Sequence, residues 1–211
     1  MPQKIVPIIE GETYHVFNRG VDKRDIFLDK SDYLRFYQSL NLFNSEEAIV
    51  NFDFVRTKVN NSTDSFQGNR LVDIQAYALL PNHFHLIIKS VTESGISEFM
   101  RRVGGGYANY FNQKYERSGA LFQGSFKRVH IERQEQYQYL FVYVNENQFV
   151  HNLIAEREIC HSSSLHYQGL AKSKIINMQL DTQYNFDESV ILAKSIYEKR
   201  KAIKQDKILF E

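Results

Sequence analysis

The chain has 211 residues, which suffice for one well-packed domain with an appended segment but not for two large domains. Its formal net charge of +1 lacks the large basic excess that marks many nucleic-acid-binding proteins. No apolar run approaches the roughly 20 residues of a membrane-spanning helix, and Cys160 as the single cysteine excludes an internal disulfide and fits a reducing cytoplasm.

The chain is predicted to begin with a strand and a helix. The strand covers residues 13–18, where aromatic and β-branched side chains end at the turn-forming Asn18-Arg19-Gly20. Ser31 and Asp32 suit a helix start, and the near-helical spacing of the following apolar residues predicts about three turns, to Asn44.

The middle of the chain is predicted to be rich in strands. A strand is expected from about residue 49 to 58, followed by a polar loop over residues 59–70. The segments 72–80 and 83–89 are strand-like, and Pro81-Asn82 between them is typical of a turn. They therefore predict a β-hairpin.

The second half is predicted to be mostly helical. A helix is expected over residues 96–112, although Gly104-Gly105-Gly106 within it costs about 1 kcal/mol per glycine relative to alanine. These glycines indicate either close approach of a backbone or DNA, or tight packing of the helix on the sheet. A strand over 126–132, a helix over 135–150 and an amphipathic, lysine-rich helix over 187–205 follow.

This order of elements predicts an α+β sandwich with its helices on one side of an antiparallel sheet. Most of the 16 Phe and 13 Tyr side chains are expected to fill the core. The others are available to stack on unpaired bases.

Two side-chain patterns point to chemistry. Strand alternation puts the imidazoles of His83 and His85 on one face, where two neutral imidazoles bind divalent metals well. Tyr143 and Asn147 lie four residues apart on one face of the helix predicted over 135–150. The other tyrosines on or near the predicted helices over 96–112 and 135–150 lack a carbonyl-bearing side chain four residues later, and they are Tyr107, Tyr110, Tyr115, Tyr137 and Tyr139. Taken alone, both patterns favour ordinary hydrogen-bonded histidines and a packing tyrosine over a metal site and a nucleophile.

Three segments of the chain carry a family resemblance. They are Tyr14-His15-Val16-Phe17-Asn18-Arg19-Gly20, Leu80-Pro81-Asn82-His83-Phe84-His85-Leu86 and Leu121-Phe122-Gln123-Gly124-Ser125-Phe126-Lys127. In this order they closely resemble the single-tyrosine HUH transposases, which include insertion sequence 200-like and REP-associated tyrosine transposases. The similarity spans roughly residues 10 to 150.

The resemblance implies a ferredoxin-like HUH-nuclease sandwich over residues 1–152, followed by a C-terminal extension over 153–211. It also implies that His83 and His85 bind Mg²⁺ or Mn²⁺ and that Tyr143 is the nucleophile.

The same resemblance puts Asn147 at the position of the third metal ligand. The sequence departs from the family pattern here, because no proline follows Asn147 and no histidine stands two residues after Tyr143. Glu146 is a competing ligand if the helix is rotated, since carboxylates suit Mg²⁺ and Mn²⁺.

The implied activity is cleavage and rejoining of single-stranded, hairpin-associated DNA through a 5′-phosphotyrosine. The resemblance implies a cytoplasmic, nucleoid-associated protein that contacts no membrane and acts either as a homodimer or as a monomer. A catalytically inactive hairpin-binding descendant, or a relaxase or replication initiator, are the alternatives. Phosphate contacts are expected from basic residues, each of which also fits an ordinary solvated surface: Arg19, Arg101, Arg102, Lys114, Arg117, Lys127 and Arg128.

Overall fold

A five-stranded antiparallel sheet forms the centre of the computed structural model, which describes residues 7–47, 69–151, 161–176 and 184–209, with side chains up to residue 202. The strand order is β4-β1-β3-β2-β5. The strands are β1 (Thr13–Arg19), β2 (Val72–Leu80), β3 (His83–Ser90), β4 (Lys127–His130) and β5 (His161–Ser162). The strand expected at 49–58 and the loop at 59–68 lie outside the described residues.

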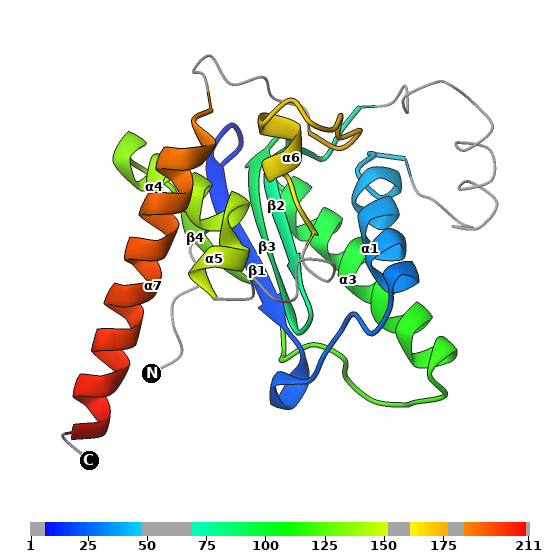
Figure 1. Cartoon of the computed structure of the whole chain (residues 1–211). Coiled ribbons are helices and arrows are strands. Elements are labelled where there is room, and N and C mark those ends of the chain that lie inside the picture. The colour runs from blue at the N-terminus through cyan, green and yellow to red at the C-terminus, as the bar shows by residue number, and fades with distance from the viewer. Residues whose placement is uncertain (1–6, 48–68, 152–160, 177–183, 210–211) are drawn as a thin grey trace.

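Helices cover both faces of this sheet (Figure 1). One face carries α1 (Lys30–Leu42) and α3 (Gly95–Lys114), and the other carries α4 (Gln134–Asn145), α5 (Asn147–Val150) and α7 (Phe186–Leu209). The prediction that all helices lie on one side is therefore wrong. The crossover helices α1, which connects β1 to β2, and α3, which connects β3 to β4, share one side of the sheet. With the strand order β4-β1-β3-β2, these two helices make the ferredoxin-like α+β arrangement that the resemblance implied.

Both faces are covered because both sides of the central strands are apolar. In β3, Phe84 packs toward α1 and α3, whereas Ile87 packs with Leu80 toward α4. A bulge between Ile74 and Ala76 adds a residue to β2 and shifts its alternation by one position.

The first crossover helix begins with a capping box. The Asp29 carboxylate accepts from the backbone N–H groups of Ser31 and Asp32, and the Asp32 carboxylate accepts from the Asp29 N–H in return. Lys114, at the end of α3, binds Asp29 and Asp32 at 2.7 Å each and so ties the two helices together.

The predicted helix over 135–150 is interrupted. Glu146 leaves the helical region with φ −101° and ψ 29°, which separates α4 from α5. Between residue 153 and the helix predicted from residue 187, the sequence shows no clear period, and the short β5 and α6 (Ser164–Tyr167) were not predicted. Near the N-terminus, the 3₁₀ turn η1 (Val21–Lys23) was not predicted either. Short elements like these carry too few residues to show a period.

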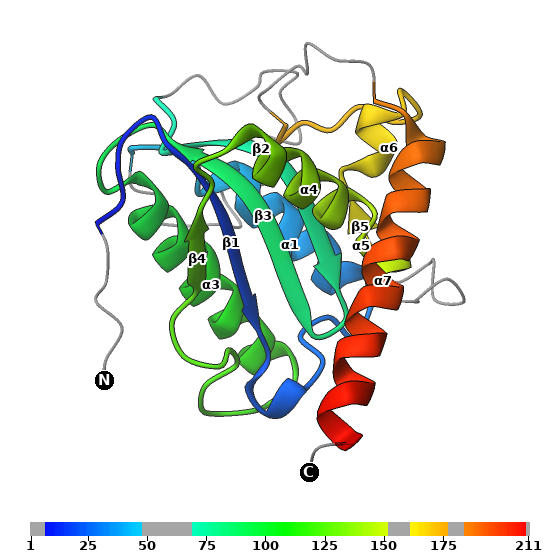
Figure 2. The same ribbon diagram turned by 90° about the vertical axis from the view of Figure 1, so that its left-hand side faces the viewer.

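The helix predicted over 187–205 is present as α7. Its packing face includes Ala193 and Ile196, whereas Ile191 is 69% exposed. Figure 2 shows α7 running past α5 along one edge of the molecule. In the part of the chain that the structure describes, no helix is long and apolar enough to cross a membrane.

Candidate metal and tyrosine site

The two strand histidines lie on the face of β3 that is turned toward α4 and α5. Phe84 between them is buried in the opposite core, so the alternation predicted from the sequence is present. On the neighbouring strand β1, His15 lies on the same face and stacks on His85, with ring centroids 5.0 Å apart.

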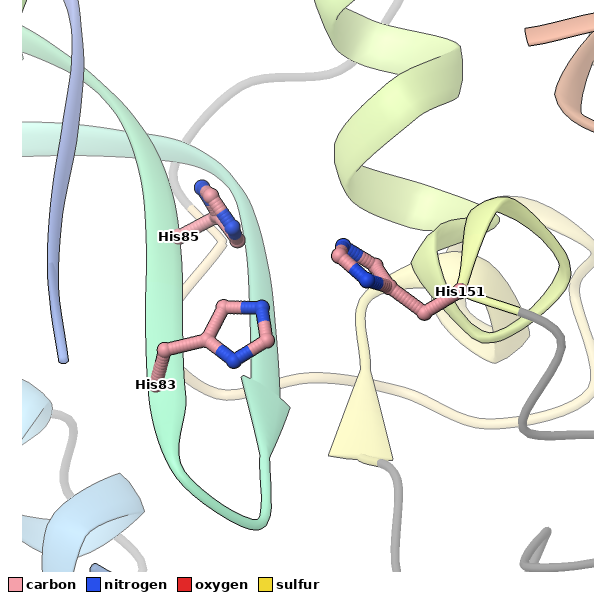
Figure 3. A group of neighbouring side chains, drawn as sticks. All are labelled: His83, His85 and His151. Carbon is pink, nitrogen blue, oxygen red and sulfur yellow. The ribbon is translucent and has the colours of Figure 1, made fainter. Parts of the chain in front are cut away.

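A third histidine, His151, joins this pair from the end of α5 (Figure 3). Each of His83, His85 and His151 offers a ring nitrogen that lies within 4.8 Å of the other two, a spacing that can hold a metal ion. The sequence prediction missed His151. His151 follows a separate short helix, α5, which begins after the break at Glu146. Its spacing from Tyr143 along the sequence therefore does not reveal that it lies beside the strand histidines.

Hydrogen bonds orient the two strand histidines. The Nδ1 of His83 lies 2.5 Å from Oδ1 of Asn82, which can only accept, so Nδ1 carries the proton and Nε2 is left with its lone pair. The Nδ1 of His85 is hydrogen-bonded to Nε2 of His15 at 2.8 Å, and when His85 Nδ1 donates this bond, Nε2 of His85 keeps its lone pair for a ligand. Such partners commonly fix the rings of metal-binding histidines. His15 and Asn82 belong to the motifs quoted above, but sequence reasoning assigned them no role.

The imidazoles of His15, His83 and His85 are neutral at neutral pH. Burial lowers the pKa of His83 to about 3 and that of His15 to about 4, and burial also lowers the pKa of His85 well below its usual value. Neutral imidazoles keep the lone pair that a metal requires.

Tyr143 lies on α4 beside these histidines. Its ring centroid is 5.3 Å from that of His85 and 6.4 Å from that of His151. Its hydroxyl accepts a hydrogen bond of 2.9 Å from Arg200 of α7. Tyr137 and Tyr139 of the same helix do not line the pocket that contains Tyr143, since Tyr137 packs on Phe141 and Tyr139 is 45% exposed.

Asn147 and Glu146 are turned away from that pocket. Asn147 is fully buried, does not line it, and donates from Nδ2 to the Tyr143 carbonyl at 3.0 Å. Glu146 is also fully buried and accepts from Ser164 and Tyr184, and burial raises the pKa of its carboxyl. The structure thus brings together Tyr143, His83 and His85 of the predicted set, with His151 where Asn147 was expected.

The pocket that holds Tyr143 and the histidines has a volume of about 1040 Å³ and a basic lining. Asp25 is the one carboxylate among its lining residues. The cations that line it come from three separate parts of the chain and are Arg19, Lys23, Lys127 and Arg200. An electropositive pocket of this kind attracts phosphates although the whole chain is nearly neutral.

The three motif segments meet at the rim of this pocket. Gly20 N–H donates to the Asn82 carbonyl at 2.8 Å, and Gln123 N–H donates to the Arg19 carbonyl at 2.8 Å. Only glycine fits at position 20, because a Cβ there would lie 2.2 Å from the Arg24 carbonyl oxygen. The motifs are thus parts of one hydrogen-bonded surface.

The predicted phosphate-binding residues do not form one patch. Arg19 and Lys127 line the pocket, whereas Arg128 follows Lys127 on β4 and so points to the opposite face of the sheet. The remaining four are engaged elsewhere: Arg101 with Glu98, Arg102 with Glu98 and the Ser45 carbonyl, Lys114 with Asp29 and Asp32, and Arg117 with Asn112 and the Ala120 carbonyl.

Comparisons with known proteins agree on the kind of protein that this fold and site define. The family model described as "Transposase IS200 like" matches residues 33–147, more than half of the chain. The chain therefore belongs to the IS200-like transposase family, whose members are DNA-acting transposases.

One solved structure shares the fold at low sequence identity. A REP-associated tyrosine transposase bound to a REP hairpin is 15% identical, with a TM-score of 0.51, over 88% of this chain and 99% of that one. A protein described as a transposase from Deinococcus radiodurans R1 is 13% identical over 71% and 96% of the two chains, but its TM-score of 0.37 is too low for a comparison of folds. No curated protein matches the sequence significantly.

Proposed function

We propose that this transposase cleaves and rejoins single-stranded DNA through a 5′-phosphotyrosine on Tyr143, at a divalent metal held by His83, His85 and His151. The observation that carries the proposal is the shared basic pocket, in which the Tyr143 ring lies beside a cluster of three histidines. All these groups come from one chain, so the chemistry itself does not require a second copy. The homodimer stays a prediction.

The donor set fits a divalent first-row metal. Three imidazole nitrogens suit a transition ion such as Mn²⁺ better than Mg²⁺, which prefers oxygen ligands. When bound, the metal would polarise the scissile phosphate and stabilise the charge that develops on it. Asn82 and His15 would keep the ring nitrogens of His83 and His85 turned toward the ion.

The chain's own residues supply the nucleophile and hold the strand. The Tyr143 Oη attacks phosphorus, a P–Oη bond forms and the P–O3′ bond breaks. The phenolic proton passes to solvent water, and the departing O3′ takes up a proton to become a free 3′-OH. Attack by another 3′-OH reverses these changes and joins new ends, because the phosphotyrosine bond conserves the energy of the original bond.

The substrate proposed is a single strand next to a hairpin. The cations Arg19, Lys23 and Lys127 would bind backbone phosphates, and the pocket is open enough for unpaired nucleotides. The structural relative was solved with a REP hairpin, which supports a hairpin partner for this chain.

The test is formation of a covalent adduct. Labelled single strands from the gene's own flanks are incubated with the protein and Mn²⁺, and adducts are resolved on a denaturing gel. Wild-type protein should form the adduct. Tyr143→Phe should bind the strand equally well and form none, because it lacks only the hydroxyl.

Tyr137→Phe and Tyr139→Phe are the matched controls and should react like wild type. Mapping of the DNA to Tyr137 or Tyr139 would reject Tyr143 as the nucleophile. A wild-type protein that binds hairpins but forms no adduct with Mn²⁺ or Mg²⁺ would support the inactive hairpin-binding alternative instead.

A further inference from the structure

Arg200 on the C-terminal helix reaches the hydroxyl of the proposed nucleophile. Its guanidinium Nη1 donates to Tyr143 Oη at 2.9 Å, and its Cζ lies 5.6 Å from the centroid of the Tyr143 ring. The two residues are 57 positions apart in sequence. Arg200 lies outside the segments that resemble the family and outside residues 33–147, which the family model matches.

The packing of α7 determines where Arg200 lies. Ala193 and Ile196 of α7 are buried against Phe149 and Val150 of α5. Arg200 follows Ile196 by four residues, so it continues the same face one helical turn further, beyond the apolar contact. The packing of α7 on α5 thus places the positive charge of Arg200 in the pocket.

The chemistry of the pair suits a tyrosine nucleophile. An ordinary tyrosine hydroxyl has a pKa near 10 and is mostly protonated at neutral pH, so attack requires stabilisation of the developing phenolate. A guanidinium stays charged at every relevant pH and supplies five N–H donors. Among the described residues, Arg200 is the cation that hydrogen-bonds the Tyr143 oxygen.

We propose that Arg200 is a catalytic residue of the transposase, which stabilises the Tyr143 oxygen as its proton leaves and then binds a non-bridging oxygen of the attacked phosphate. This inference rests on the proposed function. As the P–Oη bond forms, the Tyr143 oxygen loses its negative charge, and the remaining guanidinium N–H groups are free to donate to the phosphate. In the rejoining step Tyr143 departs as a phenolate, so Arg200 accelerates both directions.

The first test compares Arg200→Met and Arg200→Lys with wild type. Lys199→Met is the matched control, since it removes an adjacent exposed charge from the same helix. Adduct formation should slow by about 10²- to 10³-fold in Arg200→Met, the usual effect of losing one donor to a developing oxyanion. Arg200→Lys should recover part of the rate, and Lys199→Met should stay within about twofold of wild type.

The pH dependence distinguishes a chemical role from a structural one. The deficit of Arg200→Met should shrink as pH rises from about 7 toward 9.5, because hydroxide then forms the phenolate without help. A deficit of equal size at every pH would show that Arg200 does not stabilise the Tyr143 phenolate and would overturn the proposal. A rate equal to or above that of wild type in Arg200→Met would overturn it as well.

A second measurement does not depend on turnover. With 3-fluorotyrosine incorporated and the Tyr143 signal assigned by the Tyr143→Phe variant, the ¹⁹F resonance of position 143 should move in Arg200→Met and stay in place in Lys199→Met. An unmoved resonance would show that Arg200 does not contact Tyr143 and would reject the inference. If the resonance moves but wild-type protein forms no adduct, the proposed function fails while the contact stands.

Discussion

The ligand set of the site depends on how one helix ends. Glu146 is buried against Ser164 and Tyr184 at the point where α4 stops. Because the backbone turns there, the residue four positions after Tyr143 points into the protein, and His151 reaches the strand histidines instead. A continuous helix would have kept Tyr143 and Asn147 on one face, as the sequence predicted.

This arrangement predicts different effects for two alanine variants. His151→Ala should weaken Mn²⁺ binding, measured by calorimetry, by at least about 10- to 100-fold, since even outer partners of a metal site contribute that much. Asn147→Ala should bind Mn²⁺ like wild type but lose about 1 kcal/mol of unfolding free energy with its bond to the Tyr143 carbonyl.

His166→Ala is the control for removal of a histidine away from this site, because His166 lines a different pocket. The reverse pattern, with metal binding lost in Asn147→Ala and kept in His151→Ala, would reinstate Asn147 as the third ligand.

At the level of elements, the three glycines of α3 have different surroundings. A Cβ at Gly106 would lie 2.9 Å from the Phe43 ring, so this glycine permits close packing of α3 near α1. Gly104 and Gly105 have open space in front of them and line a small pocket beside Phe122 and Phe126. Within the described part of the chain, none of the three glycines packs on the sheet or meets another backbone, since Gly106 meets the Phe43 side chain at the end of α1. Close approach of DNA at Gly104 and Gly105 stays a prediction.

A matched pair of alanine variants tests this division. Gly105→Ala should raise the free energy of unfolding by about 0.5–1 kcal/mol, because alanine favours the helix and meets no neighbour. Gly106→Ala should be less stable than Gly105→Ala, since Phe43 must move to admit the methyl group. Urea titrations of the two variants measure the difference, and equal stabilisation by both would contradict the proposed packing role of Gly106.

At the scale of the whole molecule, charge is concentrated rather than abundant. The net charge is +1, yet the pocket around Tyr143 has four cationic side chains and one carboxylate. Other predicted phosphate-binding residues are held by internal contacts, such as Lys114, whose ion pairs join α3 to the start of α1. The affinity for single-stranded DNA should therefore depend on the few cations of this pocket.

The salt dependence of single-strand affinity checks this. Arg19→Ala and Lys127→Ala should each reduce the slope of log affinity against log salt concentration by about 0.7, the value for one lost contact with a single-strand phosphate. Arg102→Ala should keep the wild-type slope and lose stability instead, because Arg102 binds Glu98 and the Ser45 carbonyl. An unchanged slope in Arg19→Ala and Lys127→Ala would exclude the pocket as the DNA-binding surface.

Local sequence determined much of this protein. Alternation along β3 predicted that His83 and His85 share a face, turn chemistry at Pro81-Asn82 predicted the hairpin, and the motifs indicated the family. These features depend on residues within a few positions of one another, where backbone geometry fixes the relation between side chains.

Tertiary structure decided which distant residues complete the site. His151 reaches the strand histidines because α4 breaks at Glu146, and Arg200 reaches Tyr143 because α7 packs on α5. The second helical layer likewise depends on an apolar face of the sheet meeting α4. Periodicity shows which side of an element is apolar, but only the packing of whole elements determines what that side meets.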